Sequence, residues 1–319
     1  MRKVSLGALI MAMSVSPTAH ALEFEPSEDT KVSIFGDFEP SIVSRTNANG
    51  NDRVDFVDQG STLGARAEHK INETFTVFGQ FEFEFFIDDS NNTVDFDEGY
   101  LGAQGPWGTA QAGGQENPYT YLIKDNVNIA EIAEISGGAI PQENNMAVYH
   151  SPTYQGFSVS TKVRMEGDGD PDPGPSGTAF GTVASFEREH FGVHAGVTTL
   201  DGGTDGAPNV NTEGETYGIT ADVSYGPAMV AAKYEQTDGN ANVRDASFGA
   251  LTGSVSYGPG KFYTSVQQVD RDSANDSTEF TVGADYKPIE SLKLYTEAGF
   301  FDRNNDQGDV VALGAIYEF

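Results

Sequence analysis

The fold of this chain is decided by the stretch Tyr217-Gly-Ile-Thr-Ala-Asp-Val-Ser-Tyr225, in which apolar residues alternate with polar or small ones. The odd-numbered positions carry Tyr, Ile, Ala, Val and Tyr, and the even-numbered positions carry Gly, Thr, Asp and Ser. Successive side chains of a strand point to opposite sides, so this pattern predicts a strand with one apolar and one polar face. Alternating segments that end in aromatic residues are typical of barrel strands that contact lipid on one face and water on the other.

The same period of two recurs along the chain. It is clear in FTVFGQFEFEF (75–85), in EFTVGADY (279–286) and in LKLYTEAGF (292–300). A soluble β-sandwich also alternates, but it usually has shorter strands and rarely carries aromatic residues at both ends of the apolar face. The pattern therefore favours a transmembrane barrel over a sandwich.

The connections between these segments alternate between two kinds. Eight are long and rich in Asn, Asp and Gly, and seven are tight turns, which together predict sixteen strands. An even strand number with long loops on one rim and short turns on the other is typical of an outer-membrane barrel. The long connections lie around 45–52, 88–94, 114–143, 166–178, 201–212, 238–244, 271–277 and 303–309, and the turns at 71–73, 105–106, 153–156, 189–192, 226–227, 257–260 and 287–290.

The composition excludes several classes of protein. The 319 residues include 48 acidic and 18 basic side chains and no cysteine, for a formal net charge of −30. Nucleic-acid binding needs a cationic surface, so no nucleic-acid partner is expected. Without cysteine the chain cannot form a disulfide scaffold or a four-cysteine zinc module. Its 21 Phe and 13 Tyr are too many for a disordered chain.

The first 21 residues predict a secretory signal peptide. Met1-Arg2-Lys3 is a short cationic start, an apolar stretch follows from Val4 to Val15, and Ala19 and Ala21 provide small residues before the cleavage site. The apolar stretch is too short for a transmembrane helix, which needs about 20 residues. We therefore expect cleavage after Ala21, export through the periplasm and a mature domain of residues 22–319.

Over this whole mature length, the chain resembles the trimeric general diffusion porins of Gram-negative bacteria. The segments that carry the resemblance are KVSIFGD (31–37), LGARAE (63–68), TVFGQFEFE (76–84), YLGAQ (100–104) and QAGG (111–114). The resemblance implies an all-β fold, a 16-stranded antiparallel transmembrane β-barrel that forms a homotrimer in the cell outer membrane, in contact with lipid and lipopolysaccharide. It also implies passive diffusion of small hydrophilic solutes and ions, with no cofactor and no catalytic step.

The end of the chain carries a further alternation. Val311, Leu313, Ala315, Tyr317 and Phe319 share one face, which is expected to point outward, and the sequence stops at Phe319. A terminal Phe preceded by apolar residues at every second position resembles the signal by which the barrel assembly machinery recognises outer-membrane barrels. We therefore expect Phe319 and Tyr317 to form the assembly signal.

The third long connection, about 115–143, is the longest, and in the porin family the third extracellular loop folds into the lumen and narrows it. A loop of this length inside a compact domain is either functional or disordered. Its stretch NIAEIAEI (128–135) is too apolar to extend into water and predicts a short helical turn. Together with the resemblance, this predicts an inward-folded third loop that forms the pore constriction.

Fixed charge at the constriction would decide which ions pass, because rings of acidic groups favour cations. The resemblance implies a wall of basic residues opposite the loop, but Asp37 stands where the family has a lysine, and marked cation preference with a weakened transverse field is therefore expected. Screening should reduce the preference at high salt, since the Debye length is about 3 Å at 1 M. The predicted acidic constriction comprises Glu116, Asp125, Glu131, Glu134, Glu143 and Asp37, and the predicted basic wall residues are Arg66, Lys162 and Arg164.

Other interpretations remain open. A substrate-specific outer-membrane channel would share the barrel but carry an aromatic slide or a binding cluster inside, whereas lumen aromatics such as Phe35 and Phe78 are scattered. A soluble secreted β-protein would need no terminal Phe319 and no detergent for extraction. An enzyme is not expected, because the nucleophile and acid motifs of barrel-embedded hydrolases are missing. A zinc site is not expected either, because His190 and His194 lack a third ligand.

Overall fold

The computed structural model describes residues 21–46, 52–88, 94–141, 143–165, 178–200, 212–240, 243–272, 276–302 and 308–319. Of the predicted signal peptide only Ala21 falls within this part, so the cleavage site stays a prediction. In the described residues, no helix has the length and apolar character needed to cross a membrane.

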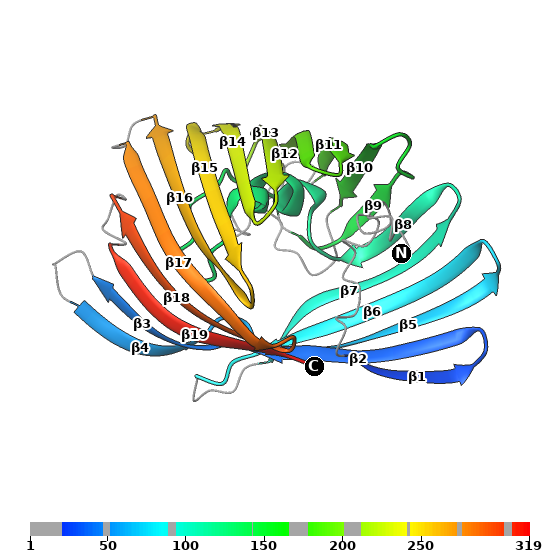
Figure 1. Cartoon of the computed structure of the whole chain (residues 1–319). Helices are drawn as coiled ribbons and strands as arrows, with labels where there is room; N and C mark the ends of the chain where they lie inside the picture. Colours follow the sequence, from blue (N-terminus) through cyan, green and yellow to red (C-terminus); the bar gives the residue numbers. More distant parts are fainter. Residues whose placement is uncertain are drawn as a thin grey trace.

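The described residues form nineteen strand segments in a single sheet, and every pairing in it is antiparallel. Figure 1 shows the segments as a ring of tilted strands. The segments are β1 (Leu22–Ser27), β2 (Thr30–Phe38), β3 (Pro40–Thr46), β4 (Asp52–Asp58), β5 (Thr62–Asn72), β6 (Phe75–Phe85), β7 (Val94–Gly105), β8 (Gly108–Gly114), β9 (Met146–His150), β10 (Phe157–Arg164), β11 (Ala179–Arg188), β12 (Phe191–Thr199), β13 (Gly214–Tyr225), β14 (Ala228–Gly239), β15 (Ala246–Tyr257), β16 (Gly260–Arg271), β17 (Ser277–Ile289), β18 (Leu292–Phe301) and β19 (Val310–Glu318).

These segments make sixteen barrel strands. β2 and β3 are two parts of one strand, interrupted at Glu39, and β4 and β5 are two parts of the next. β19 pairs with both β3 and β2, which closes the barrel. β1 pairs with β2 beyond the end of β19, since Glu318 faces Asp37 and Leu22 faces Ile34. The predicted closed, 16-stranded antiparallel β-barrel is confirmed.

The two faces of the wall follow the predicted period of two. On β13, Ile219 and Val223 are exposed on the outside, whereas Thr216 and Thr220 are buried on the inside. β19 repeats the pattern, with Leu313 exposed between buried neighbours. In the bilayer core only the sheet itself can satisfy the backbone polar groups, and a closed barrel with an apolar exterior meets that requirement.

Two local predictions are wrong. The turn expected at 287–290 lies later, because β17 continues through Ile289 with a register shift between Tyr286 and Ile289. Pro288 lies at this irregularity, where the strands form no regular backbone hydrogen bond that its missing N–H would remove. The helical turn expected at 128–135 is not formed, and the only helical turns in the described part of this loop lie earlier, at η2 (Thr120–Lys124) and η3 (Asp125–Val127).

The long segment after β8, residues 115–141, lies along the inner face of the wall (Figure 1). It packs in three apolar clusters, one against β11, one against β14 and β15, and one against β16, β18, β19 and β3. The segment therefore covers the wall from β11 round to β3, and in the part of the chain that the structure describes no such cluster lies on β2 or on β5 to β7. Its buried residues in the clusters are Tyr119, Ile123, Val127, Ala130, Ala133, Ile135 and Ile140.

Candidate functional site

A buried carboxylate on β18 holds the middle of the 115–141 segment. Glu297, which is 2% exposed, accepts hydrogen bonds from the backbone N–H groups of Glu131, Ile132 and Ala133 at 2.8, 2.8 and 2.9 Å. It also accepts the hydroxyl of Tyr263 at 2.6 Å. Because a backbone N–H group that bonds to Glu297 is unavailable to a helix, this anchor explains why residues 128–135 form no helical turn.

Two further buried carboxylates hold the part of the segment that follows. Glu279 on β17 accepts both the backbone N–H and the hydroxyl of Ser136 at 2.6 Å. Glu235 on β14 accepts the N–H of Gly138 at 2.9 Å and the ammonium group of Lys233 at 3.0 Å. The wall thus supplies acceptors for the segment's backbone donors, as buried polar groups require.

Hydroxyl groups of the wall donate hydrogen bonds to carbonyl groups of the segment. Thr216, Thr252 and Thr281 donate to the carbonyl oxygens of Ala139, Val127 and Ala133, respectively. Together with the carboxylates and the apolar clusters, these bonds fix the segment to one half of the lumen. The other half, beside β2 and β5 to β7, is where an open path can remain.

An acidic cavity of about 430 Å³ occupies that side of the lumen. Of the described residues that line it, seven are carboxylic acids and none is Lys, Arg or His. The cavity lies between the wall and the two ends of the 115–143 loop. Its lining residues are Phe35, Gly36, Asp37, Thr62, Glu82, Asp97, Glu98, Gln115, Glu116, Glu143 and Glu318.

Hydrogen bonds fix the position of several of these carboxylates. Asp37 accepts the backbone N–H of Thr62 at 2.8 Å. Glu98 accepts the N–H of Glu116 at 3.2 Å, and Glu143 accepts the N–H of Asn117 at 2.9 Å. The start of the loop is therefore hydrogen-bonded both to β7 and to the end of the same loop.

Burial and mutual repulsion shift the proton affinity of the loop acids. Burial, together with the negative charges of Glu143, Asp125 and Glu98, raises the pKa of Glu116 to about 8. Burial likewise raises the pKa of Glu134 to about 7, helped by the nearby charge of Asp125. The negative charge of the loop consequently changes close to neutral pH.

Three of the six predicted constriction acids, Asp37, Glu116 and Glu143, line this cavity. The other three do not: Glu131 forms an ion pair with Lys293 at 2.5 Å, Asp125 lies in η3, and Glu134 lies farther along the loop. The sequence-based choice left out four lining acids, which are Glu82, Asp97, Glu98 and Glu318. Glu82 and Glu98 occupy polar positions of alternating strands, a signal that indicates the face but not the cavity.

The three predicted basic wall residues are buried in the inner face and do not line the cavity. Arg66, Lys162 and Arg164 are 5%, 1% and 0% exposed. Arg66 bonds to Glu68 at 2.8 Å and lies over the ring of Phe78 at 4.3 Å from its centroid. Arg164 bonds to Asn144 at 3.0 Å. Their role as pore-wall cations stays a prediction.

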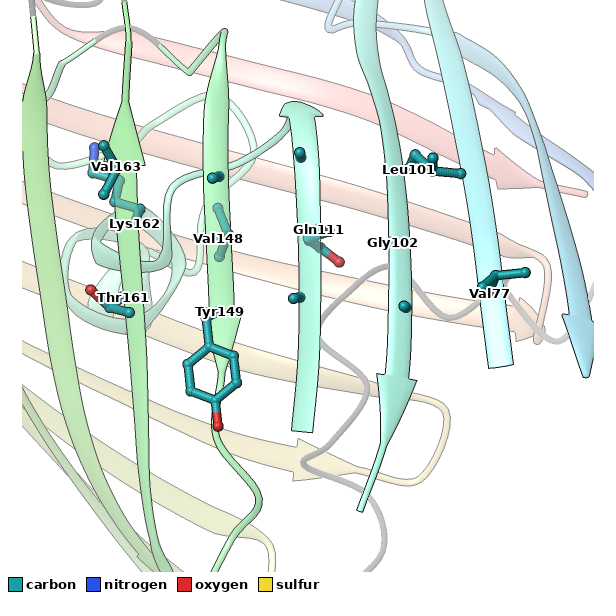
Figure 2. A pocket seen from close by; sticks show the side chains of 13 residues that line it. Val77, Leu101, Gly102, Gln111, Val148, Tyr149, Thr161, Lys162 and Val163 are labelled. Atoms are coloured by element: carbon teal, nitrogen blue, oxygen red, sulfur yellow. The ribbon is translucent and has the colours of Figure 1, made fainter. Parts of the chain in front are cut away.

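A second hollow lies on the outer face of the barrel, across β6 to β10 (Figure 2). It has a volume of about 790 Å³ and is lined largely by small apolar residues such as Ala103, Ala112 and Ala147. Leu101 at its edge is 70% exposed, which places the hollow outside the lumen. It is separate from the acidic cavity.

The acidic cavity does not form a metal-chelating cluster. Within the described ranges, no group of three or more His, Asp or Glu side chains is arranged so that it could hold a metal ion. The carboxylates are instead spread around the cavity, which suits a charged passage.

A closed sixteen-strand barrel with an apolar exterior and an acid-lined interior defines a transmembrane β-barrel channel. The chain belongs to the Gram-negative porin family, whose model matches residues 8–306. It is accordingly an outer-membrane porin, a channel rather than an enzyme.

Two relatives match this chain along its whole length. It is 28% identical, over 369 aligned positions that cover all of both chains, to a "Monosaccharide porin" of a Halomonas species and, with the same figures, to the "Major outer membrane protein" of Halomonas elongata. Among solved structures, the anion-selective porin of Comamonas acidovorans matches with a TM-score of 0.79, at 16% identity, over 91% of this chain and 100% of that one. At this identity the likeness shows the fold alone.

Proposed function

We propose that this porin is a general diffusion channel for small hydrophilic solutes and ions, with a preference for cations. The observation that carries the proposal is the acidic cavity, whose described lining includes seven carboxylic acids and no basic side chain. Carboxylates along a narrow passage stabilise cations and repel anions.

The path of the third loop supports the same proposal. Its apolar clusters and its bonds to Glu235, Glu279 and Glu297 cover the wall from β11 to β3. Permeating ions are thereby directed to the uncovered side, past Asp37, Glu116 and Glu143. On this proposal the loop is the constriction, and its fixed position sets the width of the pore.

The remaining parts of the proposal concern assembly. After export through the periplasm, the barrel assembly machinery would insert the chain by recognising Phe319 and Tyr317. The porin would then work as a homotrimer, in contact with lipid and lipopolysaccharide, as the resemblance implies.

A sugar-specific channel is the second candidate function. The full-length likeness to a relative named monosaccharide porin favours it. Solute entry into proteoliposomes separates the two: a general channel admits sugars at rates that fall smoothly with solute size, whereas a specific channel saturates with one sugar.

The charge preference is tested by the reversal potential of the detergent-purified protein in a planar bilayer under a KCl gradient. We expect stepwise conductance with a potential near the potassium limit. The double variant Glu82→Gln with Asp97→Asn should shift the potential toward zero, while Glu187→Gln, a wall acid outside the cavity lining, should leave it in place. A wild-type potential near zero, or one of the opposite sign, would refute the cation preference.

A further inference from the structure

Lys124 is the only basic residue in the sequence of the third loop. Residues 115–143 contain five acidic side chains and this one lysine. Lys293, on the wall, is paired with Glu131 of the loop. Lys124, by contrast, forms no ion pair with a described residue. The loop therefore carries one positive charge that no described carboxylate binds directly.

Packing fixes the stem of Lys124 and leaves its charged end in water. A Cβ atom at Gly137 would lie only 2.7, 3.1 and 2.9 Å from Cγ, Cδ and Cε of Lys124, so the stem lies directly across this glycine. Ile123 and Val127 are completely buried against the wall, whereas Lys124 is only partly buried, and its unpaired Nζ is not among the buried side-chain atoms. Inside a closed barrel, the water that reaches this nitrogen belongs to the lumen.

The charge of Lys124 acts on three carboxylates of the loop. Burial raises the pKa of Glu116, Asp125 and Glu134, and the ammonium group of Lys124 acts in the opposite direction on all three. Glu116 also lines the acidic cavity. Lys124 is thus a counter-ion that is covalently attached to the loop and offsets part of its negative charge.

A fixed positive charge affects monovalent and divalent cations unequally. The energy of an ion near a fixed charge is proportional to the charge of the ion, so Lys124 raises the energy of Mg²⁺ by twice as much as that of K⁺. A change in the occupancy of the passage by K⁺ therefore becomes the square of that change for Mg²⁺. Carboxylates are also the preferred ligands of divalent cations, so an acidic passage without a fixed cation would retain them and conduct less well.

We propose that Lys124 is a specificity-determining residue of the channel, a tethered counter-ion that favours monovalent over divalent cations in the acidic lumen. The five acidic residues of the loop still leave the passage attractive to K⁺, and the packing across Gly137 keeps the positive charge in place. This inference rests on the proposed function, because it requires the third loop to form the constriction.

Single-channel recording in about 0.1 M KCl, with MgCl₂ added as the probe, tests the proposal. Lys124→Met keeps an unbranched stem across Gly137 but removes the charge. We expect the K⁺ conductance to rise about twofold and the Mg²⁺ concentration that halves the current to fall about fourfold. Lys124→Arg, which keeps the charge, should behave as wild type. Lys287→Met removes an exposed lysine at the end of β17, outside the loop, and is the matched control that should also leave both values in place.

A second variant allows the charge to be changed after folding. The sequence contains no cysteine, so Lys124→Cys carries a single thiol. In the folded channel, which heat-dependent gel migration identifies, methanethiosulfonate reagents attach either an aminoethyl or a sulfonatoethyl group to this thiol. Mg²⁺ should block the sulfonate form at least about tenfold more strongly than the ammonium form, because the two forms differ by two charges.

The outcomes separate the parts of the proposal. Equal Mg²⁺ block in wild type and Lys124→Met would overturn it, and so would a higher K⁺ conductance without stronger Mg²⁺ block. A thiol that does not react in the folded channel would overturn the placement of Lys124 at the lumen surface.

The KCl reversal potential of the wild type in the same bilayers tests the proposed function separately. A cation-selective wild type whose Mg²⁺ block is unaltered in Lys124→Met would overturn this inference alone. A wild-type potential near zero, together with stronger Mg²⁺ block in Lys124→Met, would overturn the proposed cation preference and support the role of Lys124.

Discussion

Replacing Glu297 by Leu should release the middle of the third loop from the barrel wall. Glu297 is almost completely buried, and four donors bond to it: the N–H groups of Glu131, Ile132 and Ala133 and the hydroxyl of Tyr263. The leucine side chain is similar in size to that of glutamate but has no hydrogen-bond acceptor. The substitution therefore leaves four donors without their partner on an otherwise intact strand.

The size of the effect follows from these contacts. A hydrogen bond to a charged group contributes about 1.5–3 kcal/mol net, so four bonds would sum to several kcal/mol if they were independent. They share one carboxylate and water can replace part of the loss, so we expect a local loss of about 4 kcal/mol. That corresponds to roughly a thousandfold more frequent opening of this part of the loop.

Hydrogen–deuterium exchange of the detergent-solubilised protein measures the opening directly. The amides of Glu131, Ile132 and Ala133 should exchange up to about a thousandfold faster in Glu297→Leu, while the amides of β13 to β17 should keep their protection. Glu187→Leu is the control, because it removes an inward-facing acid that pairs with His194 and, among the described residues, makes no hydrogen bond to the loop. Single channels of Glu297→Leu should also show noisier open currents.

Unchanged protection of the three amides would refute the anchoring role of Glu297. It would mean that the apolar cluster formed by Ala130 and Ala133 with Tyr263 and Phe301 is sufficient to hold the loop. Faster exchange throughout the barrel would refute the argument in another way, because it would show that the substitution destabilises the fold rather than the loop.

Three further predictions concern charge and assembly. Raising the pH from about 6 to about 9 should increase the cation preference. Burial raises the pKa of Glu116 to about 8, so this side chain is neutral below that pH and negative above it. The reversal potential at each pH measures the change, and an equal change in the Glu116→Gln variant would contradict the prediction. Glu82→Lys places a positive charge in the cavity lining and should move the KCl reversal potential toward zero, whereas an unaltered potential would show that ions bypass the cavity. Phe319→Ala keeps the backbone hydrogen bonds to Gly36 at 3.1 and 2.9 Å but removes the ring beside Phe38. The amount of folded protein in the outer membrane should therefore fall severalfold, while refolding of the variant in detergent is retained. Equal amounts of wild type and variant in the membrane would rule out the assembly role.

The barrel could be predicted from local sequence because each strand carries its own evidence. The alternation around Tyr217 to Tyr225 reflects lipid on one side and the lumen on the other, and the structure places β13 there with Ile219 and Val223 outward. Pairing between successive strands then follows from the tight turns. Only irregular steps escaped prediction, such as the shift at Pro288, because a strand interruption has no periodic signal.

The candidate site was harder to predict because it depends on where the loop lies. Glu297 and Glu82 are both acidic residues at inward positions of strands, but the loop covers Glu297 and leaves Glu82 at the cavity. The same long-range effect separates Glu116, in the cavity lining, from Glu131, which pairs with Lys293. The period of two gives the side of the wall on which a residue lies. Whether the loop covers that residue is decided by contacts between residues more than a hundred positions apart in the chain.

The acidic cavity can also be regarded as a compartment with its own fixed-charge concentration. Seven carboxyl groups share about 430 Å³. Even if only half of them are ionised, they represent a concentration of immobile negative charge on the order of 10 M, against which a bath near 1 M salt is a small perturbation. By the Donnan equilibrium, a compartment with this much fixed negative charge would exclude mobile anions and take up counter-ions from dilute medium and from brine alike. If this compartment lies on the proposed permeation path, the loss of cation preference at high salt that the Debye length alone predicts should therefore be small.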